Sequence, residues 1–277
     1  MPGGNGHDAP VSAAGLRREI SARNLLRAEQ FEHEVSYGSQ PCVIYGESEG
    51  IHGNFLPASY RRIMANPQWK ERLSKAYSAS RYVPRRMDRK RYELESACSS
   101  DALLMNIFCY PNVMKRTPVC ALLGVGAGVQ PEFGFRPAIP LARGGADRTE
   151  IDMRLGSLLV EAKLTEGDFQ LASMNLLLRY RDLEEVFDLT MLPVSNGVIH
   201  SYQLVRGVLA AHATGCTFTV LCDRRRADLT EKWFEVLRAV EGSALRSRLC
   251  LLTWQELSRT LPRPAQSFLA EKYGICG

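Results

Sequence analysis

The sequence lacks any apolar run that approaches the roughly 20 residues needed to cross a lipid bilayer. Its first fifteen residues are rich in Gly and Pro and have no apolar segment of the kind that signal peptides carry. These two absences predict a cytosolic protein with a disordered start and no membrane contact. Hydrophobic residues make up 45% of the 277 residues and charged residues 23%, which is the balance of a folded chain with its own core.

Paired metal-binding cysteines are also lacking. No two of the cysteines have CxxC spacing, and the five histidines are scattered without ligand spacing, so a structural zinc site is not expected. Buried thiols are expected in place of disulfides. The run Gly124 to Gly128 has no clear strand before it or helix after it, which predicts a loop and not a dinucleotide site. The cysteines are at positions 42, 98, 109, 120, 216, 222, 250 and 276.

Positive charge is concentrated in one segment. Residues 61–91 contain eleven Lys and Arg against two acidic residues, so this segment carries +9 and the remainder of the chain −4. Three aromatic residues, Trp69, Tyr77 and Tyr82, are interleaved with them, and Tyr60 and Tyr92 flank the segment. Basic side chains neutralise phosphates and aromatic faces stack on bases, so one interpretation is contact with a polyanion. The alternative is a solvated helix surface. The residues proposed for the contact are Arg85, Arg86, Arg89, Lys90 and Arg91.

Apolar periodicity and turn residues predict a chain of alternating helices and strands. One helix, which ends before Pro111, has two alternative starts: Ser99 or Ser100 as the N-cap, or an unbroken helix from about Arg89. Residues 36–58 are expected to be irregular or short-stranded, and 117–148 mostly loop with a short strand within 133–141. Helices are predicted over 16–34, from Asn66-Pro67, over 168–187, 201–213 and 228–241, and from 255; strands are predicted over 149–154, 158–164, 217–222 and 249–253.

The strands at 149–154 and 158–164 form a predicted hairpin that carries unusual charge. Because side chains alternate along a strand, Glu150 and Asp152 share one face, and Glu161 and Lys163 share a face of the second strand. Glu161 interrupts an otherwise apolar run, and a buried carboxylate beside an ammonium needs a partner or a metal ion. The alternative is a solvent-exposed edge hairpin with a structural Glu–Lys pair.

Asp152 and Glu161-Ala162-Lys163 resemble the motif of the PD-(D/E)XK, or restriction-endonuclease-like, superfamily. That motif pairs an Asp near the end of one strand with Glu-x-Lys on the next; its leading Pro is replaced here by Ile151. Gln203 on a later helix and Glu95 near the first core helix match further positions, with Glu93 and then Asp101 as alternatives to Glu95. The resemblance covers roughly residues 90–255.

The resemblance implies an α/β fold with a restriction-endonuclease-like core, an αβββαβ mixed sheet flanked by helices. The implied organisation is a disordered N-terminus over residues 1–15, a basic and mainly helical extension over 16–90, and a nuclease-like domain over 91–277. Alternating helices and strands from about residue 94 agree with a mixed sheet of this kind.

The family's chemistry implies a role for each matched residue. Asp152, Glu161, the carbonyl of Ala162 and Glu95 would hold Mg²⁺, with Mn²⁺ as a substitute. Lys163 would position the attacking water or stabilise the transition state. Gln203 would orient Lys163 or contact the strand, and Arg206 with the basic segment would contact nucleic acid.

The implied function is a DNA endonuclease in restriction, defence or repair, with RNA left open as a substrate. Because many related enzymes work as dimers, a homodimer is a further expectation. Two alternatives stand beside it: a catalytically inactive nucleic-acid-binding protein on the same fold, and a metal-free scaffold that binds protein partners.

Overall fold

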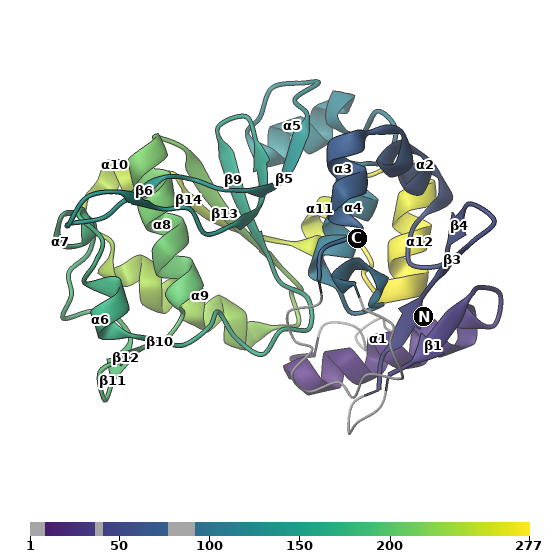
Figure 1. The fold of residues 1–277 in the computed structure, drawn as a ribbon, viewed down its shortest axis with the longest axis horizontal. Coiled ribbons are helices and arrows are strands. Elements are labelled where there is room, and N and C mark those ends of the chain that lie inside the picture. Colours follow the sequence, from purple (N-terminus) through teal and green to yellow (C-terminus); the bar gives the residue numbers. More distant parts are fainter. Residues whose placement is uncertain (1–8, 37–40, 77–91) are drawn as a thin grey trace, which may run out of the picture. The chain divides into compact units, whose positions relative to one another are not determined.

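The computed structural model describes residues 9–36, 41–76 and 92–277 (Figure 1). The chain forms two compact units. Unit 1 comprises Met1–Pro10 and Val129–Thr253, and unit 2 comprises Val11–Gly128 and Trp254–Gly277. No helix in the described ranges is both long and apolar enough to span a bilayer.

Unit 1 is built on a five-stranded mixed sheet with the order β14-β13-β9-β8-β5. Neighbouring strands β5, β8 and β9 are antiparallel, whereas β9, β13 and β14 are parallel to one another. Parallel neighbours need a crossover connection, and the helices α8 and α9 supply the two that this sheet requires. The bounds are β5 Pro131–Phe135, β8 Ile151–Leu155, β9 Leu158–Ala162, α8 Tyr202–Thr214, β13 Thr217–Cys222, α9 Ala227–Ala239 and β14 Leu249–Thr253.

Both crossover helices pack on the same face of this sheet (Figure 1). The alternating β13 side chains Phe218 and Val220 are buried in one cluster with Val208 of α8 and Trp233 of α9. Gly207 allows α8 to come this close, because a Cβ atom there would collide with the Phe218 ring. The period-2 pattern of β13 therefore decides which face the helices cover.

The predicted hairpin, the two parallel strands and the crossover helices are confirmed within one or two residues. Gly156 occupies the turn of the hairpin with a φ of +58°, a conformation that glycine adopts without strain. A mixed α/β architecture with a mixed sheet and flanking helices is therefore the fold of unit 1.

The predicted helix over 168–187 is wrong. Two four-residue helices occupy that stretch, because its backbone amides bond elsewhere. Met174 donates to the Gly197 carbonyl and Arg181 to the Pro140 carbonyl, both of which lie outside the stretch. The shorter elements of unit 1 are β6 Ile139–Pro140, β7 Ala146–Asp147, β10 Ala172–Ser173, α6 Met174–Leu177, α7 Leu183–Val186, β11 Val194–Ser195, β12 Val198–Ile199 and α10 Ser243–Arg246.

Unit 2 is mainly helical with short two-stranded sheets. Its elements before the sheet of unit 1 are α1 Ala13–Ala28, β1 His33–Val35, β2 Val43–Tyr45, β3 Glu47–Ser48, β4 Ile51–His52, α2 Pro57–Ala65, α3 Pro67–Arg72, η2 Glu93–Glu95, α4 Ser100–Phe108, η3 Val113–Lys115 and α5 Thr117–Leu123. The chain returns to unit 2 with α11 Trp254–Thr260 and α12 Arg263–Tyr273.

A buried lysine links the N-terminal and C-terminal segments of the chain that make up unit 2. Lys272 on α12 donates to the side-chain oxygens of Asn24 on α1, at 2.9 Å, and of Asn54, at 2.6 Å. Asn24 in turn donates to the Lys272 carbonyl at 3.0 Å. The predicted boundary after residue 90 would separate these partners, whereas the units divide after Gly128 and again after Thr253.

Local capping decides two other predictions in unit 2. Ser99 accepts a hydrogen bond from the Ala102 amide at 3.1 Å, so α4 starts at Ser100 and the unbroken helix from Arg89 is excluded. Asn66 caps α3 through the amides of Gln68 and Trp69, as predicted.

The expected loop at 117–148 is wrong at its start, where α5 forms. The expected disorder up to residue 15 is wrong from Ala13 onwards, where α1 begins.

Candidate active site

The two acidic residues of the motif lie on neighbouring strands of unit 1. Asp152 is on β8 and Glu161 on β9, and the strands pair with Met153 opposite Val160. Continuing this antiparallel register by one residue sets Asp152 opposite Glu161. The Asp152 Oδ2 atom accepts a hydrogen bond from the Ala162 amide at 2.7 Å, which holds the carboxylate against the end of β9. The hairpin therefore brings the two predicted acids together.

Lys163 follows β9 directly and is buried, with 5% of its surface exposed. Its amide donates to the Leu221 carbonyl of β13 at 2.8 Å, which continues the strand ladder past the end of β9. Its ammonium Nζ lies 2.9 Å from Glu161 Oε1 and 5.6 Å from the centroid of the Phe169 ring. The solvent-exposed edge hairpin is thereby excluded, because Glu161 is also buried at 2% exposure.

Negative charge exceeds positive charge around Lys163. Burial alone would lower the pKa of Lys163, but the carboxylates of Glu161, Glu166 and Asp152 outweigh burial and raise this pKa above its ordinary value. Among these four groups, the three carboxylates and the one ammonium, the formal charge is −2. Such an excess in a buried setting calls for a compensating cation.

Glu166 is a site residue that the sequence did not single out. Its Oε2 atom accepts a hydrogen bond from the Leu164 amide at 2.6 Å, so the side chain folds back toward the end of β9. The available signal was an acid three residues after Lys163, within the same polar turn that follows an apolar strand.

Gln203 lies in the first turn of α8, where the Gln helix was expected. Its amide donates to the Phe169 carbonyl at 2.9 Å, and the Phe169 ring is the one beside the Lys163 ammonium. The Gln203 Oε1 atom is buried without a hydrogen-bond partner among the described residues. A buried acceptor of this kind needs a donor, and a bound water or ligand can supply it.

Arg206 is placed differently from its expected role. It is 3% exposed, and its two terminal nitrogens donate to the carbonyls of Thr149, at 2.8 Å, and Glu150, at 2.9 Å. These contacts tie α8 to the residues that lead into β8. Because its guanidinium is buried in unit 1 and bonded to two backbone carbonyls, Arg206 is not placed to contact a phosphate.

Three consecutive arginines follow β13 in the sequence Asp223-Arg224-Arg225-Arg226, a pattern typical of a solvated loop, but most of this segment is buried. Asp223 and Arg226 have no exposed surface, and Arg225 is 5% exposed. Arg225 pairs with Asp223 through two hydrogen bonds of 2.9 Å. Arg226 pairs with Asp228 and also reaches back to the turn after Lys163. The charges are buried because each guanidinium has a carboxylate partner.

The remaining predicted residues do not belong to unit 1. Glu95 belongs to unit 2, in η2, where its Oε2 atom accepts a hydrogen bond from the Tyr92 amide at 3.2 Å. The site described above consists of unit 1 residues alone. The basic residues Arg85, Arg86, Arg89, Lys90 and Arg91 lie outside the described residues.

The donor set of this site suits a hard divalent cation. Mg²⁺ takes oxygen ligands and is usually bound by one or two carboxylates, with water and phosphate oxygens around them. Asp152, Glu161 and the carbonyl of Ala162 could provide the protein oxygens, and the excess of two negative charges matches the ion. Within the described ranges, no three His, Cys, Asp or Glu side chains form a ready metal cluster.

A mixed α/β unit with two acids and a lysine at the end of one hairpin agrees with the restriction-endonuclease-like motif that the sequence resembles. The family model described as Restriction Endonuclease associating with ARP matches residues 27–274. The chain belongs to this family. No curated protein and no solved structure matches it. Membership in a family of restriction endonucleases indicates a nuclease as the class of activity.

Proposed function

We propose that the protein is a Mg²⁺-dependent nuclease that hydrolyses phosphodiester bonds in DNA, as an endonuclease in restriction, defence or repair. The observation that carries the proposal is the excess of carboxylates at the end of the β8–β9 hairpin. Asp152, Glu161 and Glu166 act on the ammonium of Lys163, in a chain of a restriction-endonuclease family. In this proposal the five-stranded sheet of unit 1 is the restriction-endonuclease-like core.

Each residue of the hairpin then has a defined task. Asp152 and Glu161, with the Ala162 carbonyl, would bind Mg²⁺, or Mn²⁺ in its place. When bound, the ion supplies a Lewis acid that lowers the pKa of a water and neutralises charge on the phosphate. The Ala162 amide keeps the Asp152 carboxylate oriented, at 2.7 Å. Lys163, held as an ammonium by its carboxylate neighbours, would donate to a phosphate oxygen as charge develops on it.

Gln203 and the basic segment complete the proposal on the substrate side. The Gln203 Oε1 atom would accept a hydrogen bond from a water or from the nucleic acid strand. Arg85, Arg86, Arg89, Lys90 and Arg91 would neutralise phosphates of the DNA backbone. Charge reversal at Arg85, Arg86 and Arg89 should then flatten the dependence of DNA binding on salt concentration, and an unchanged slope would return this segment to a solvated surface.

The direct test is cleavage of supercoiled plasmid and single-stranded DNA by the purified protein, with Mg²⁺, Mn²⁺ or a chelator. We expect cleavage that depends on the ion, that Lys163→Ala abolishes, and that Lys115→Ala, a change of an exposed lysine in unit 2, retains. DNA binding by Lys163→Ala, measured by gel shift with Ca²⁺, should stay within about threefold of wild type, because the lysine acts on the transition state.

Two outcomes would redirect the assignment. If the wild-type protein binds DNA and cuts neither DNA nor RNA with any of these ions, the alternative of an inactive nucleic-acid-binding protein takes over. If cleavage survives in Lys163→Ala, the hairpin is not the catalytic centre.

A further inference from the structure

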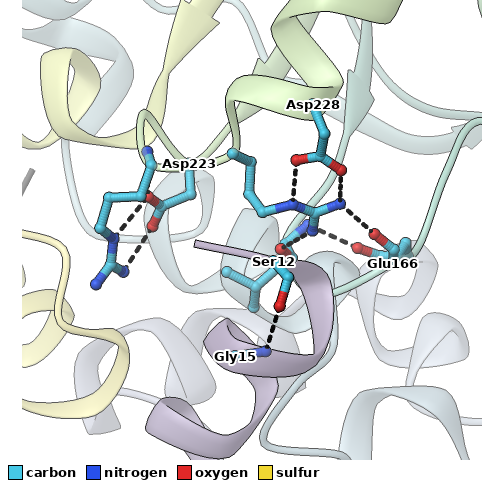
Figure 2. Close-up of polar contacts among 8 residues, drawn as sticks. Ser12, Gly15, Glu166, Asp223 and Asp228 are labelled. Atoms are coloured by element: carbon cyan, nitrogen blue, oxygen red, sulfur yellow. Dashed lines mark hydrogen bonds and ion pairs between the residues drawn. The ribbon is translucent and has the colours of Figure 1, made fainter. Parts of the chain in front are cut away.

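A buried arginine braces the turn that follows the Lys163 strand (Figure 2). Arg226 has no exposed surface and lies at the start of α9, directly after the loop that leaves β13. Its Nη1 atom donates to the Leu164 carbonyl at 3.2 Å, and its Nη2 atom donates to the Glu166 carbonyl at 2.9 Å. The Arg226 side chain therefore hydrogen-bonds the first and the last residue of the Leu164–Glu166 turn.

The opposite edge of the same guanidinium is held by Asp228. Arg226 Nε donates to Asp228 Oδ1 at 2.8 Å and Nη2 to Asp228 Oδ2 at 2.9 Å. This bidentate pairing fixes the plane of the guanidinium, and the two carbonyl contacts use further N–H groups of the same fork. A lysine ammonium is a point donor and cannot make both sets of contacts in one plane.

The braced turn is contiguous with the residues of the site. Lys163 immediately precedes Leu164, and the Leu164 amide donates to the Glu166 carboxylate at 2.6 Å. The Arg226 charge is matched by Asp228, so the brace leaves the excess negative charge around Lys163 unchanged. The arrangement thus fixes geometry without weakening the attraction for a cation.

We propose that Arg226, held by Asp228, is a positioning residue that fixes the Leu164–Glu166 turn and thereby the ammonium of Lys163 and the carboxylate of Glu166. This inference deepens the proposed nuclease function and rests on it for its catalytic consequence. Catalysis by positioned groups is sensitive to displacements of about 1 Å, which can cost on the order of 100-fold in rate. Neither Arg226 nor Asp228 touches the reacting atoms in this scheme.

The test compares Arg226→Lys with a matched control, Arg248→Lys. Arg248 also belongs to unit 1 and donates to backbone carbonyls, those of Cys216 at 2.9 Å and Ala211 at 3.5 Å, but it precedes β14 at the other end of the parallel strands. We expect Arg226→Lys to lower kcat for Mg²⁺-dependent cleavage about 100-fold, with KM for DNA within about threefold of wild type. Arg248→Lys should leave both within about twofold.

A second variant, Asp228→Asn, tests the same contact with a smaller structural change, in case Arg226→Lys does not fold. Asp228→Asn keeps an oxygen that can accept one hydrogen bond but loses the charge and the bidentate geometry, so kcat should fall by about tenfold. The Asp228 side chain is 43% exposed, so the variant introduces no buried cavity.

Hydrogen exchange of the amides at 163–167 is the second readout and does not depend on turnover. The Lys163 and Leu164 amides are hydrogen-bonded in the braced turn, so exchange there should speed up at least about tenfold in Arg226→Lys and stay unchanged in Arg248→Lys. If exchange is unchanged in Arg226→Lys, Arg226 does not hold the Leu164–Glu166 turn. If exchange becomes faster but kcat is unchanged, Arg226 holds the turn but does not position groups for catalysis. If the wild-type protein cleaves nothing, the proposed function fails, while the exchange comparison still decides whether Arg226 holds the turn.

Discussion

Each unit contains a cluster of charged side chains around a largely buried lysine, and the two clusters differ in their charge balance. In unit 2, Asp101 lies 3.1 Å from Arg72 and 2.6 Å from Lys75, and Lys75 lies 3.4 Å from Glu93. Two acids there meet two cations. Burial lowers the pKa of Lys75, and the carboxylates of Asp101 and Glu93 outweigh it, so that this pKa is raised.

In unit 1, by contrast, three carboxylates, those of Asp152, Glu161 and Glu166, act on the ammonium of Lys163. The pKa of Lys163 is raised for the same physical reason as that of Lys75, so the direction of a pKa shift does not distinguish the two clusters. The balance of formal charge within each cluster does distinguish them. The four groups of the unit 2 cluster balance in formal charge, whereas the four groups around Lys163 carry two excess negative charges, which a divalent cation can neutralise.

The largest expected effect separates the two clusters by activity. Asp152→Asn keeps the shape of the side chain but removes one charge from the proposed metal site, so Mg²⁺-dependent cleavage should fall about 1000-fold. Asp101→Asn should leave cleavage within about threefold at a temperature where the variant is folded. Initial rates of plasmid cleavage measure both. Equal losses in the two variants would break the distinction between a functional and a structural cluster.

The next largest effect is on stability, and here we expect Asp101→Asn to lose more than Asp152→Asn. Asp101→Asn leaves Arg72 and Lys75 with one acid fewer, and breaking a buried ion pair on one side costs about 3 kcal/mol. Asp152→Asn reduces an excess of like charge, so its free energy of unfolding should stay within about 1 kcal/mol of wild type. Urea denaturation followed by circular dichroism gives both values. A larger loss in Asp152→Asn would mean that its carboxylate is structural.

The sequence was sufficient to predict the hairpin that carries the site. The apolar run 158–164 with Glu161 inside it, the turn at Gly156 and the acid at Asp152 are local signals, and each depends on residues a few positions apart. The parallel strands and crossover helices were predicted for the same reason, because their apolar patterns are regular and bounded by turn residues.

What the sequence could not predict depends on contacts between distant residues. Arg226 bonds to a carbonyl 62 positions earlier, and a run of three arginines is read as solvated unless its carboxylate partners are known. Lys272 bonds to Asn24 across 248 positions, which is why the last helices join unit 2. The helix predicted over 168–187 failed similarly, since carbonyls outside that stretch accept its amides.

The smallest expected effect concerns a third buried lysine. The partners of Lys272 are the neutral amides of Asn24 and Asn54, and burial together with the charge of Arg27 lowers the pKa of Lys272 well below 10.5. Between the lowered pKa and 10.5 the unfolded chain binds more protons than the folded one. The contribution of Lys272 to stability therefore increases with pH across this window. Lys75, whose pKa is raised, contributes a constant amount below 10.5.

The unfolding free energy of wild type minus that of Lys272→Met should accordingly increase with pH between about pH 8 and pH 10, by at most about 1.4 kcal/mol per pH unit. The same difference for Lys75→Met should be flat over that range. Urea titrations at each pH provide both. A flat difference for Lys272→Met would show that its ammonium is retained through the whole range.

The most direct test of the charge-balance account is the location of bound Mn²⁺ by anomalous diffraction from crystals of the protein. The account predicts an anomalous peak at about 2.1 Å from carboxylate oxygens of both Asp152 and Glu161, and none at Asp101. A peak at Asp101, or an empty hairpin at a saturating Mn²⁺ concentration, would contradict it.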